Sequence, residues 1–419
     1  MFRFDRFTLV ALILLTIASV NPVMASGNLP VLQGETAERV PAASQACDPD
    51  GLQESGAVYR ICMPTVIPWN GDLVVYAHGY VSPTEPVGIA EDWMTVPGTS
   101  MTIDQVANSK GYAFATTSYS TNGLAVLEGI ADLVDLVDIF TAEKGEPDKV
   151  YLIGGSEGGL ITALAVERYP GVFDGGLAMC GPYGDFGHQI NHFGDFRVVF
   201  DYFFPGLMPG SPIDVPDWLM EQWDSYYETT IKPEIEDPAN ASLVQQLLNV
   251  TNAPYDAQDP STKEDTIRGL LWYNAFATND GTDRLGGQPF DNQNRMYTGS
   301  DDDVQLNQGV QRFSADRAAL DEIAANYQTT GKLSVPLVTL HTTGDPVVPY
   351  RHATIYRGKT IAADNIALHD HFEAERYGHC NFTFTEFRAA FSRLVDMVNN
   401  PPPYQPVYRV FLPVIMNAP

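Results

Sequence analysis

The sequence VYLIGGSEGGLITAL, residues 150–164, joins an apolar segment of β type to a segment with helical periodicity through four glycines around one serine. Gly154, Ser156 and Gly158 match the G-x-S-x-G pattern of a nucleophile elbow, a sharp strand-to-helix turn that exposes the serine hydroxyl. Glycines on either side let the strand and the helix approach without a Cβ clash. The alternative is a glycine-rich loop that only packs a helix on a strand. A P-loop would need a lysine after the glycines, and none follows.

Outward from this stretch, apolar β-branched segments alternate with helical patterns. Strands are predicted over residues 57–64, 72–79, 112–119, 149–154, 175–181, 335–344 and 365–372. Helices are predicted over residues 124–145, 158–170, 315–327 and 385–400. This alternation is typical of a mostly parallel sheet covered by helices. We therefore predict an α/β fold with a mostly parallel sheet flanked by helices.

One long interval, residues 182–332, breaks this alternation. It has no clear strand pattern but contains many aromatic residues and prolines. Because a structureless loop of this length is implausible in a compact domain, we predict a mainly helical cap or lid. The core is then split into a first part, 26–181, and a second part, 333–400. A proline-rich spacer and a short apolar tail follow at 401–419.

The N-terminus has the features of a secretory signal. Arg3 and Arg6 precede an apolar run that ends near Val-Met-Ala, with small residues at the usual cleavage positions. We predict a signal peptide over residues 1–25. An uncleaved anchor is the alternative, although the run at 7–20 is short for a bilayer span. The sequence thus predicts a secreted or extracytoplasmic protein.

The charge balance restricts the partners. The chain has 24 Lys and Arg against 52 Asp and Glu, a formal net charge of −28. Such a surface repels phosphate backbones and anionic lipids. We therefore expect no nucleic acid partner and, after signal cleavage, no membrane partner. The sequence indicates neither a cofactor nor an oligomeric state.

The four cysteines, Cys47, Cys62, Cys180 and Cys380, suggest disulfides in an exported protein. Three pairings are possible. We favour Cys47 with Cys62, because the polar turn between them could close a hairpin. This leaves Cys180 and Cys380, either as a second disulfide or as buried free thiols.

A serine nucleophile needs a base, and the base needs an acid that holds its tautomer. In this architecture the acid and then the histidine follow the serine along the chain. Asp345 directly follows the predicted strand 335–344, at the strand end where catalytic acids of such sheets lie. A turn aspartate before a proline is the structural alternative. His379 lies between the last predicted strand and the final helix, at the corresponding loop position.

Other histidines are weaker candidates for the base. His352, His369 and His371 also follow Asp345, but His352 starts a helix-like segment. The side chains of His369 and His371 point the same way along a predicted strand. Three roles are open for them: surface residues, core residues or metal ligands. His341 lies inside a predicted strand and is expected to be structural.

Stabilisation of a tetrahedral intermediate requires preset hydrogen-bond donors. One candidate is the backbone N–H of Glu157, directly after the serine. The second is the backbone N–H of Tyr80, in the loop after an early strand. The side chain of Glu157 is expected only to favour the helix N-terminus.

These motifs resemble the α/β-hydrolase superfamily, with the oxyanion loop at 78–80, the elbow at 154–158, then Asp345 and His379 in the family's order. The resemblance covers roughly residues 57–181 and 333–400, and implies a serine hydrolase with a cap at the interval between them. Secreted feruloyl esterases are similar in having a cysteine just after the histidine, as Cys380 is here. They also have one just before the serine, where this chain has Gly155.

The sequence predicts a secreted serine esterase that acts on a small or polymeric ester: Ser156 attacks, His379 transfers the proton and Asp345 orients His379. A peptidase or amidase of the prolyl-oligopeptidase-like type is the alternative, since it uses the same groups. A non-catalytic binding protein on a hydrolase scaffold is the third possibility. No metal site is predicted. His188 and His192 have a zinc-compatible spacing but lack the glutamate of a metalloprotease motif.

Overall fold

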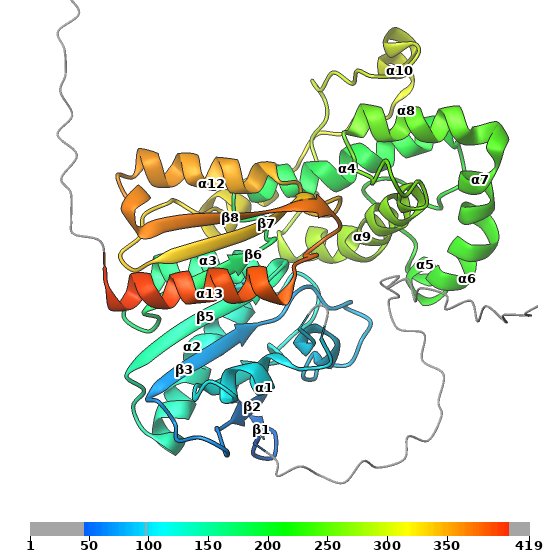
Figure 1. Ribbon diagram of the computed structural model, residues 1–419. Helices are drawn as coiled ribbons and strands as arrows, with labels where there is room; N and C mark the ends of the chain where they lie inside the picture. The colour runs from blue at the N-terminus through cyan, green and yellow to red at the C-terminus, as the bar shows by residue number, and fades with distance from the viewer. Residues whose placement is uncertain (1–45, 97–98, 402–419) are drawn as a thin grey trace, which may run out of the picture. The chain divides into compact units, whose positions relative to one another are not determined.

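An eight-stranded sheet forms the centre of the computed structural model (Figure 1), with strand order β1-β2-β4-β3-β5-β6-β7-β8. The structure describes residues 46–96 and 99–401. The predicted signal peptide at 1–25, and the predicted tail from residue 402 on, lie outside the described residues. The strands are β1 (Gly51–Leu52), β2 (Val58–Cys62), β3 (Asp72–Ala77), β4 (Ala113–Thr117), β5 (Lys149–Gly155), β6 (Gly175–Met179), β7 (Leu337–Gly344) and β8 (His369–Tyr377).

The sheet is mostly parallel, and the prediction of the fold class is confirmed. Only β1 with β2, and β2 with β4, pair antiparallel at one edge, whereas β3 to β8 form five parallel pairs with their neighbours. The last strand was predicted at 365–372 but spans His369–Tyr377, four residues later. Its last six residues, FEAERY, include charged side chains that hide the strand pattern, while pairing with β7 supplies the backbone partners.

Helices cover both faces of the sheet because alternate strand residues are apolar on each face. Leu73, Val75 and Ala77 of β3 join one buried cluster with α2 (Val126–Lys144), α3 (Glu157–Arg168) and α12 (Arg351–Ala362). Val74 and Tyr76 join another cluster with α1 (Ile103–Asn108) and α13 (Phe384–Asn399). This double burial makes the strand sequences nearly continuous apolar runs.

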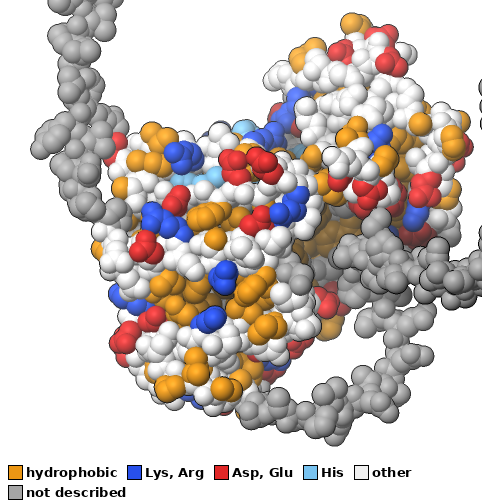
Figure 2. All heavy atoms as spheres, viewed as in Figure 1, with side chains coloured by type: hydrophobic (Ala, Val, Ile, Leu, Met, Phe, Trp, Pro, Cys, Tyr) orange, Lys and Arg blue, Asp and Glu red, His pale blue; other side chains and the backbone are white. Residues whose placement is uncertain are grey.

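The face of α1 and α13 carries a groove. Its lining includes Ile103, Val106, Phe387 and Phe391. Figure 2 shows apolar side chains over this region, with basic side chains among them.

The segment at 182–332, between β6 and β7, is here called the insertion. It contains helices and no strand of the sheet, and the structure describes all of it. Its helical elements are α4 (Phe186–Phe203), α5 (Asp217–Glu221), α6 (Trp223–Tyr226), η2 (Tyr227–Ile231), α7 (Lys232–Glu236), η3 (Pro238–Asn240), α8 (Ala241–Thr251), α9 (Thr262–Arg284), α10 (Asp303–Gly309), α11 (Arg317–Glu322) and η4 (Ile323–Tyr327). Most of these helices gather beside one end of the sheet (Figure 1).

The insertion has its own apolar core, which explains its aromatic content. Phe196, Phe200, Trp223 and Tyr227 are buried there against apolar side chains of α8 and α9. Arg197 is fully buried in the same region and bonds to Asp201 and Asn274 as well as to two backbone carbonyls. A buried guanidinium is tolerated because its donors have partners.

Two disulfides are present, Cys47–Cys62 and Cys180–Cys380. Cys62 ends β2 and lies beside Cys47 in an isolated antiparallel bridge, as a hairpin closure requires. Cys180 directly follows β6, and its N–H donates to Leu340 of β7. Within residues 46–96 and 99–401, no helix combines the length and the apolar character that a bilayer span requires.

Candidate active site

Ser156 occupies the turn between β5 and α3. Its backbone has φ 58° and ψ −123°, in a region that non-glycine residues rarely adopt. The turn is held from both sides, because the Ser156 N–H donates to the Met179 carbonyl at 3.0 Å and the Ser156 carbonyl accepts from Gly159 at 2.9 Å. The residue is 4% exposed. The fold therefore imposes the strained conformation on this serine.

The two glycines of the motif are required by close packing. A Cβ on Gly154 would overlap with the carbonyl group of Gly158, and a Cβ on Gly158 would overlap with the carbonyl oxygen of Ala77 at the end of β3. Any larger residue at 158 would push α3 away from β3. The glycines thus bring the start of α3 against the loop that carries His78 and Tyr80.

His379 and Asp345 approach Ser156 from the ends of two other parallel strands. Asp345 follows the last residue of β7, and His379 lies two residues after the end of β8. The His379 Nε2 atom lies 2.8 Å from Ser156 Oγ, and His379 Nδ1 lies 2.8 Å from Asp345 Oδ2. These partners place the imidazole proton on Nδ1, so that Nε2 accepts from the serine hydroxyl. The arrangement can move a proton from Ser156 to His379 while Asp345 stabilises the resulting imidazolium.

The carboxylate of Asp345 is almost fully buried, at 1% exposure. Its Oδ1 accepts hydrogen bonds of 2.9 Å from the N–H groups of Val347 and Val348. The Nε2 atom of His341 lies 3.7 Å from Asp345 Oδ2. Burial lowers the pKa of His341, which then donates from Nε2 to the Val348 carbonyl as a neutral ring. The Asp345 loop is therefore rigidly held, with one carboxylate oxygen left for His379.

The other candidate histidines form their hydrogen bonds with residues other than Ser156 and Asp345. His369 and His371 both contact the hydroxyl of Thr339, at 3.0 and 2.8 Å, and burial lowers the pKa of each to about 4. The N–H of Asp185 donates to His352 Nδ1 at 3.2 Å.

The two histidines with zinc-compatible spacing do not converge. His188 is exposed, whereas His192 is buried and its Nε2 donates to the carbonyl of Pro346 at 2.9 Å.

The candidate oxyanion loop is anchored on both sides. His78 is buried and stacks on Tyr119 with ring centroids 3.9 Å apart, and the Tyr119 hydroxyl donates to the His78 carbonyl at 3.0 Å. The Tyr80 hydroxyl donates to the Phe276 carbonyl of α9 at 3.0 Å. The loop that carries the Tyr80 N–H is therefore connected to the insertion through the Tyr80 side chain.

Glu157 differs from the expectation that its side chain only favours the helix N-terminus. The carboxyl group is buried, and burial raises its pKa to about 8, with nearby Asp280 and Glu128 adding to the effect. Glu157 Oε1 accepts a hydrogen bond from the Ala125 N–H at 2.9 Å. At neutral pH the side chain is mainly an uncharged acid beside Ser156.

A largely apolar pocket opens at Ser156 between the sheet and the insertion. It encloses about 920 Å³ of space, part of it open to solvent. Its lining includes Tyr80 and Leu160 from the core and Phe186, Phe193 and Tyr273 from the insertion. Tyr80 was a candidate from the sequence, whereas the density of aromatic residues was the only sequence signal for the pocket residues of the insertion.

Tyr273 is a site residue that sequence reasoning missed. Its ring stacks on Phe193, with centroids 5.0 Å apart and planes 3° from parallel. The residue lines the same pocket as Ser156, and burial raises the pKa of Tyr273 above its ordinary value. Through Tyr273, helix α9 of the insertion reaches the pocket at Ser156.

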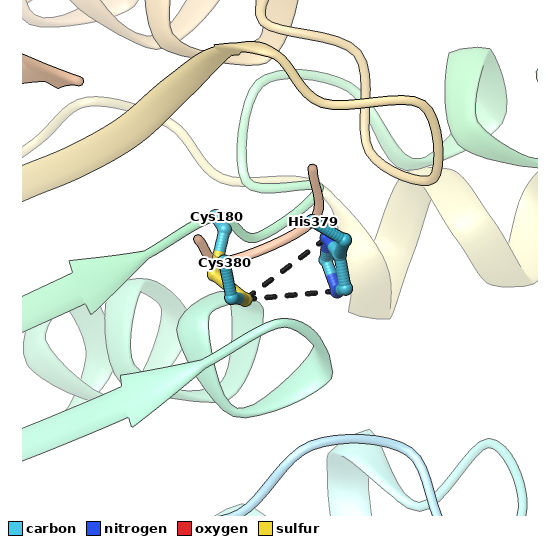
Figure 3. Close-up of side chains that lie close together, drawn as sticks. All are labelled: Cys180, His379 and Cys380. Atoms are coloured by element: carbon cyan, nitrogen blue, oxygen red, sulfur yellow. Dashed lines mark hydrogen bonds between the residues drawn. A yellow bond between two sulfur atoms is a disulfide. The ribbon is translucent and has the colours of Figure 1, made fainter. Parts of the chain in front are cut away.

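The Cys180–Cys380 disulfide lies directly beside His379 (Figure 3). Cys380 Sγ is 3.6 Å from His379 Nε2. Cys180, Cys380 and His379 form one of two described groups whose spacing could suit a metal ion, and the other is Cys47, Cys62 and Asp104. In both groups the cysteines are joined in a disulfide, so neither offers a thiolate ligand.

The sequence matches the model of the family described as serine aminopeptidase, S33, over residues 126–259. No curated protein matches the sequence significantly. Similar solved structures include feruloyl esterase B from Aspergillus oryzae, with a TM-score of 0.43, 15% identity, and coverage of 83% of this chain and 79% of that chain. An esterase from Pyrococcus furiosus has a TM-score of 0.44, 12% identity, and coverage of 88% and 95%.

Peptidases are also among the similar structures. An acylaminoacyl peptidase from Pyrococcus horikoshii has a TM-score of 0.40 and 10% identity, with coverage of 87% of this chain. The present chain spans 36% and 43% of the length of two acylaminoacyl peptidases that it matches.

Proposed function

Because the chain belongs to the α/β-hydrolase superfamily, we propose that it is an exported serine hydrolase that cleaves carboxylic esters through an acyl-enzyme on Ser156. The observation that carries this proposal is the hydrogen-bonded series Ser156–His379–Asp345, with 2.8 Å at both contacts. Ser156 attacks the ester carbonyl, and His379 accepts its proton and then gives it to the leaving alcohol. Water, activated by His379, releases the acyl group.

The negative oxygen of the tetrahedral intermediate is stabilised by the N–H groups of Tyr80 and Glu157. Support comes from the packing of Gly158 against Ala77, which brings the start of α3 to the loop after β3. Glu157 also begins α3, whose N-terminal dipole end favours negative charge. We assign the insertion at 182–332 the role of a cap, because its helices supply most of the apolar wall of the pocket.

Export is part of the proposal. The predicted signal at 1–25 and the two disulfides both support an oxidising compartment. N-terminal sequencing of the chain recovered outside an expressing host tests cleavage after about Ala25.

A serine peptidase is the second candidate, favoured by the match to the serine aminopeptidase family over residues 126–259. Esters and amides share the proposed groups, so the two candidates differ in substrate and not in the nucleophile.

The test compares initial rates on p-nitrophenyl acetate, butanoate and octanoate with rates on peptide p-nitroanilides. A fluorophosphonate probe reports the activated serine independently of the substrate. Ser156→Ala should abolish turnover and labelling, whereas Ser225→Ala, which changes an exposed serine of α6, should preserve both. Dominant anilide turnover would replace the ester proposal by the peptidase. Absence of labelling at Ser156 would contradict both and favour a binding protein.

A further inference from the structure

Several residues that line the pocket at Ser156 carry buried side-chain atoms without a hydrogen-bond partner. Buried side-chain atoms without a hydrogen-bond partner in the described structure include Gln189 Oε1, Thr282 Oγ1 and Gln288 Oε1. All three residues line this one pocket. Gln189 belongs to α4, whereas Thr282 and Gln288 belong to the end of α9 and the loop directly after it, so that two separate segments meet at this pocket.

The side-chain amide of Gln189 is held through its nitrogen, and its oxygen has no hydrogen-bond partner. The residue is 4% exposed, and its Nε2 donates to the Val347 carbonyl at 2.8 Å. This bond settles the orientation of the amide, because the reverse orientation would set two carbonyl oxygens against each other. Val347 belongs to the loop that holds the Asp345 carboxylate. Gln189 Oε1 is therefore a fixed acceptor beside the proposed catalytic machinery.

Gln288 is fixed through its backbone. Its N–H donates to Asp316 Oδ2 at 2.9 Å, and its carbonyl accepts from the Asp316 N–H at 2.7 Å. The side-chain oxygen is buried and unpaired. Thr282 adds a hydroxyl that can donate or accept. Threonines in helices often bond to a carbonyl one turn earlier, but the Thr282 hydroxyl has no such partner in the described structure. Buried polar atoms of native proteins nearly always have partners, so the ligand of this pocket is expected to supply them.

The charge of the pocket restricts that ligand. No lysine or arginine is among the lining residues, all of which the structure describes. Glu157, whose carboxyl group accepts from the Ala125 N–H, also lines the pocket. An anionic substrate group would therefore be desolvated without a compensating cation.

We infer that the pocket binds a neutral, mainly apolar group of the substrate that carries a hydroxyl or N–H donor, and that Gln189 Oε1 and Gln288 Oε1 accept from it. The inference rests on the proposed function, because it identifies the substrate class of the same site. An amide oxygen only accepts, so an ether or a ketone at the same position cannot replace the donor. A site built for a hydrogen bond rejects an analogue that lacks it, because its own polar atoms stay unpaired.

The experiment uses three p-nitrophenyl esters that differ in one group: 4-phenylbutanoate, 4-(4-hydroxyphenyl)butanoate and 4-(4-methoxyphenyl)butanoate. A second series, acetate esters of the three corresponding 4-arylbutanols, presents the same groups on the alcohol side. In one of the two series we expect kcat/KM for the hydroxyl compound to exceed that of the methoxy compound by about tenfold or more. Equal kcat/KM within both series would overturn the inference and indicate that water alone occupies the polar atoms.

Variants identify the acceptors. Gln189→Met and Gln288→Met keep the length of the side chain and remove the oxygen, and at least one of them should bring the hydroxyl-to-methoxy ratio close to 1. The ratio is measured within each variant, so a general loss of activity does not affect it. Gln308→Met changes an exposed glutamine of α10 and should keep the wild-type ratio. A ratio that both pocket variants retain would overturn the assignment.

A binding measurement tests this inference even if the proposed catalytic function is wrong. If the purified chain hydrolyses none of the esters, the esterase proposal fails. Calorimetry with the Ser156→Ala variant then compares 4-(4-hydroxyphenyl)butanamide with its methoxy analogue. Tighter binding of the hydroxyl compound by about tenfold would still support the pocket chemistry, and equal affinities would overturn it.

Discussion

Glu157 Oε1 accepts a 2.9 Å hydrogen bond from the backbone N–H of Ala125, which joins the residue after the proposed nucleophile to the start of α2. The carboxyl group is buried, and loss of hydration raises its pKa to about 8. Arg284 lies near enough to oppose this shift, but it also pairs with Glu128 and Asp280. An acid of the first turn of α3 is therefore held mainly protonated at neutral pH.

This carboxyl group makes stability depend on pH. The ordinary pKa is 4.5, so between pH 4.5 and 8 the folded chain keeps a proton that the unfolded chain releases. The stabilisation is complete below pH 4.5 and is lost as the pH rises through 8. Glu157→Gln keeps an acceptor for the Ala125 N–H but does not titrate. We expect the wild type to lose on the order of 1–4 kcal/mol relative to this variant between pH 5 and pH 9.

Urea denaturation of both proteins at pH 5, 7 and 9 checks this prediction. Parallel stability curves would contradict it. Activity supplies a second readout, because a charge on Glu157 would oppose a developing oxyanion. The rate of the wild type should therefore fall above pH 8 more steeply than that of Glu157→Gln.

Asp345→Asn tests the role of the buried acid. The amide can still accept from the N–H groups of Val347 and Val348, but it no longer stabilises a charged His379 ring. We expect kcat for ester cleavage to fall by about 10³–10⁴-fold with the fold retained. Steady-state kinetics with circular dichroism checks this, and Asp301→Asn at an exposed position is the control. A loss below tenfold would mean that Asp345 does not act through His379.

The Cys180–Cys380 disulfide is expected to support activity more than the Cys47–Cys62 disulfide. It fastens the loop of His379 to the end of β6, whereas Cys47–Cys62 closes a segment at the sheet edge. Replacing either pair by serines should lower the free energy of unfolding by about 2–5 kcal/mol. Only the Cys180→Ser/Cys380→Ser protein should also lose at least tenfold in kcat, because the histidine is no longer positioned. Equal loss of kcat in the two double variants, measured on folded protein, would refute this role.

The Tyr80 hydroxyl bond to the Phe276 carbonyl is expected to hold the oxyanion loop against α9. Tyr80→Phe removes this bond and keeps the ring. We expect kcat to fall by about three- to tenfold while the free energy of unfolding falls by about 1 kcal/mol. Tyr226→Phe removes a bond of the same length, 3.0 Å to the Leu207 carbonyl within the insertion, and should lower stability alone. Equal effects of the two variants on kcat would show that the Tyr80 bond is only structural.

Local patterns were enough to predict the fold class. Alternate residues of β3, such as Leu73 and Val74, enter buried clusters on opposite faces, and this double burial produces the continuous apolar runs seen in the sequence. The glycines at 154 and 158 also have a local cause, since a Cβ at either position would collide with nearby backbone. Two-residue β1 and six-residue α1 were not predicted, because elements this short have no measurable periodicity.

The sequence by itself determined the sheet, the strand-to-helix turn at Ser156 and the order in which an acid and a histidine follow it. It left four candidates for the base that accepts the proton of Ser156, because all of them come after Asp345: His352, His369, His371 and His379. Only the tertiary structure places His379 Nε2 2.8 Å from Ser156 Oγ and commits the other three rings to Thr339 or Asp185. It alone decided that Gln189, Tyr273 and Gln288 share the pocket with Ser156. The physical reason is that strand and turn patterns arise from neighbours in the chain, whereas these contacts join residues 30 or more positions apart, whose meeting depends on how strands pair and helices pack.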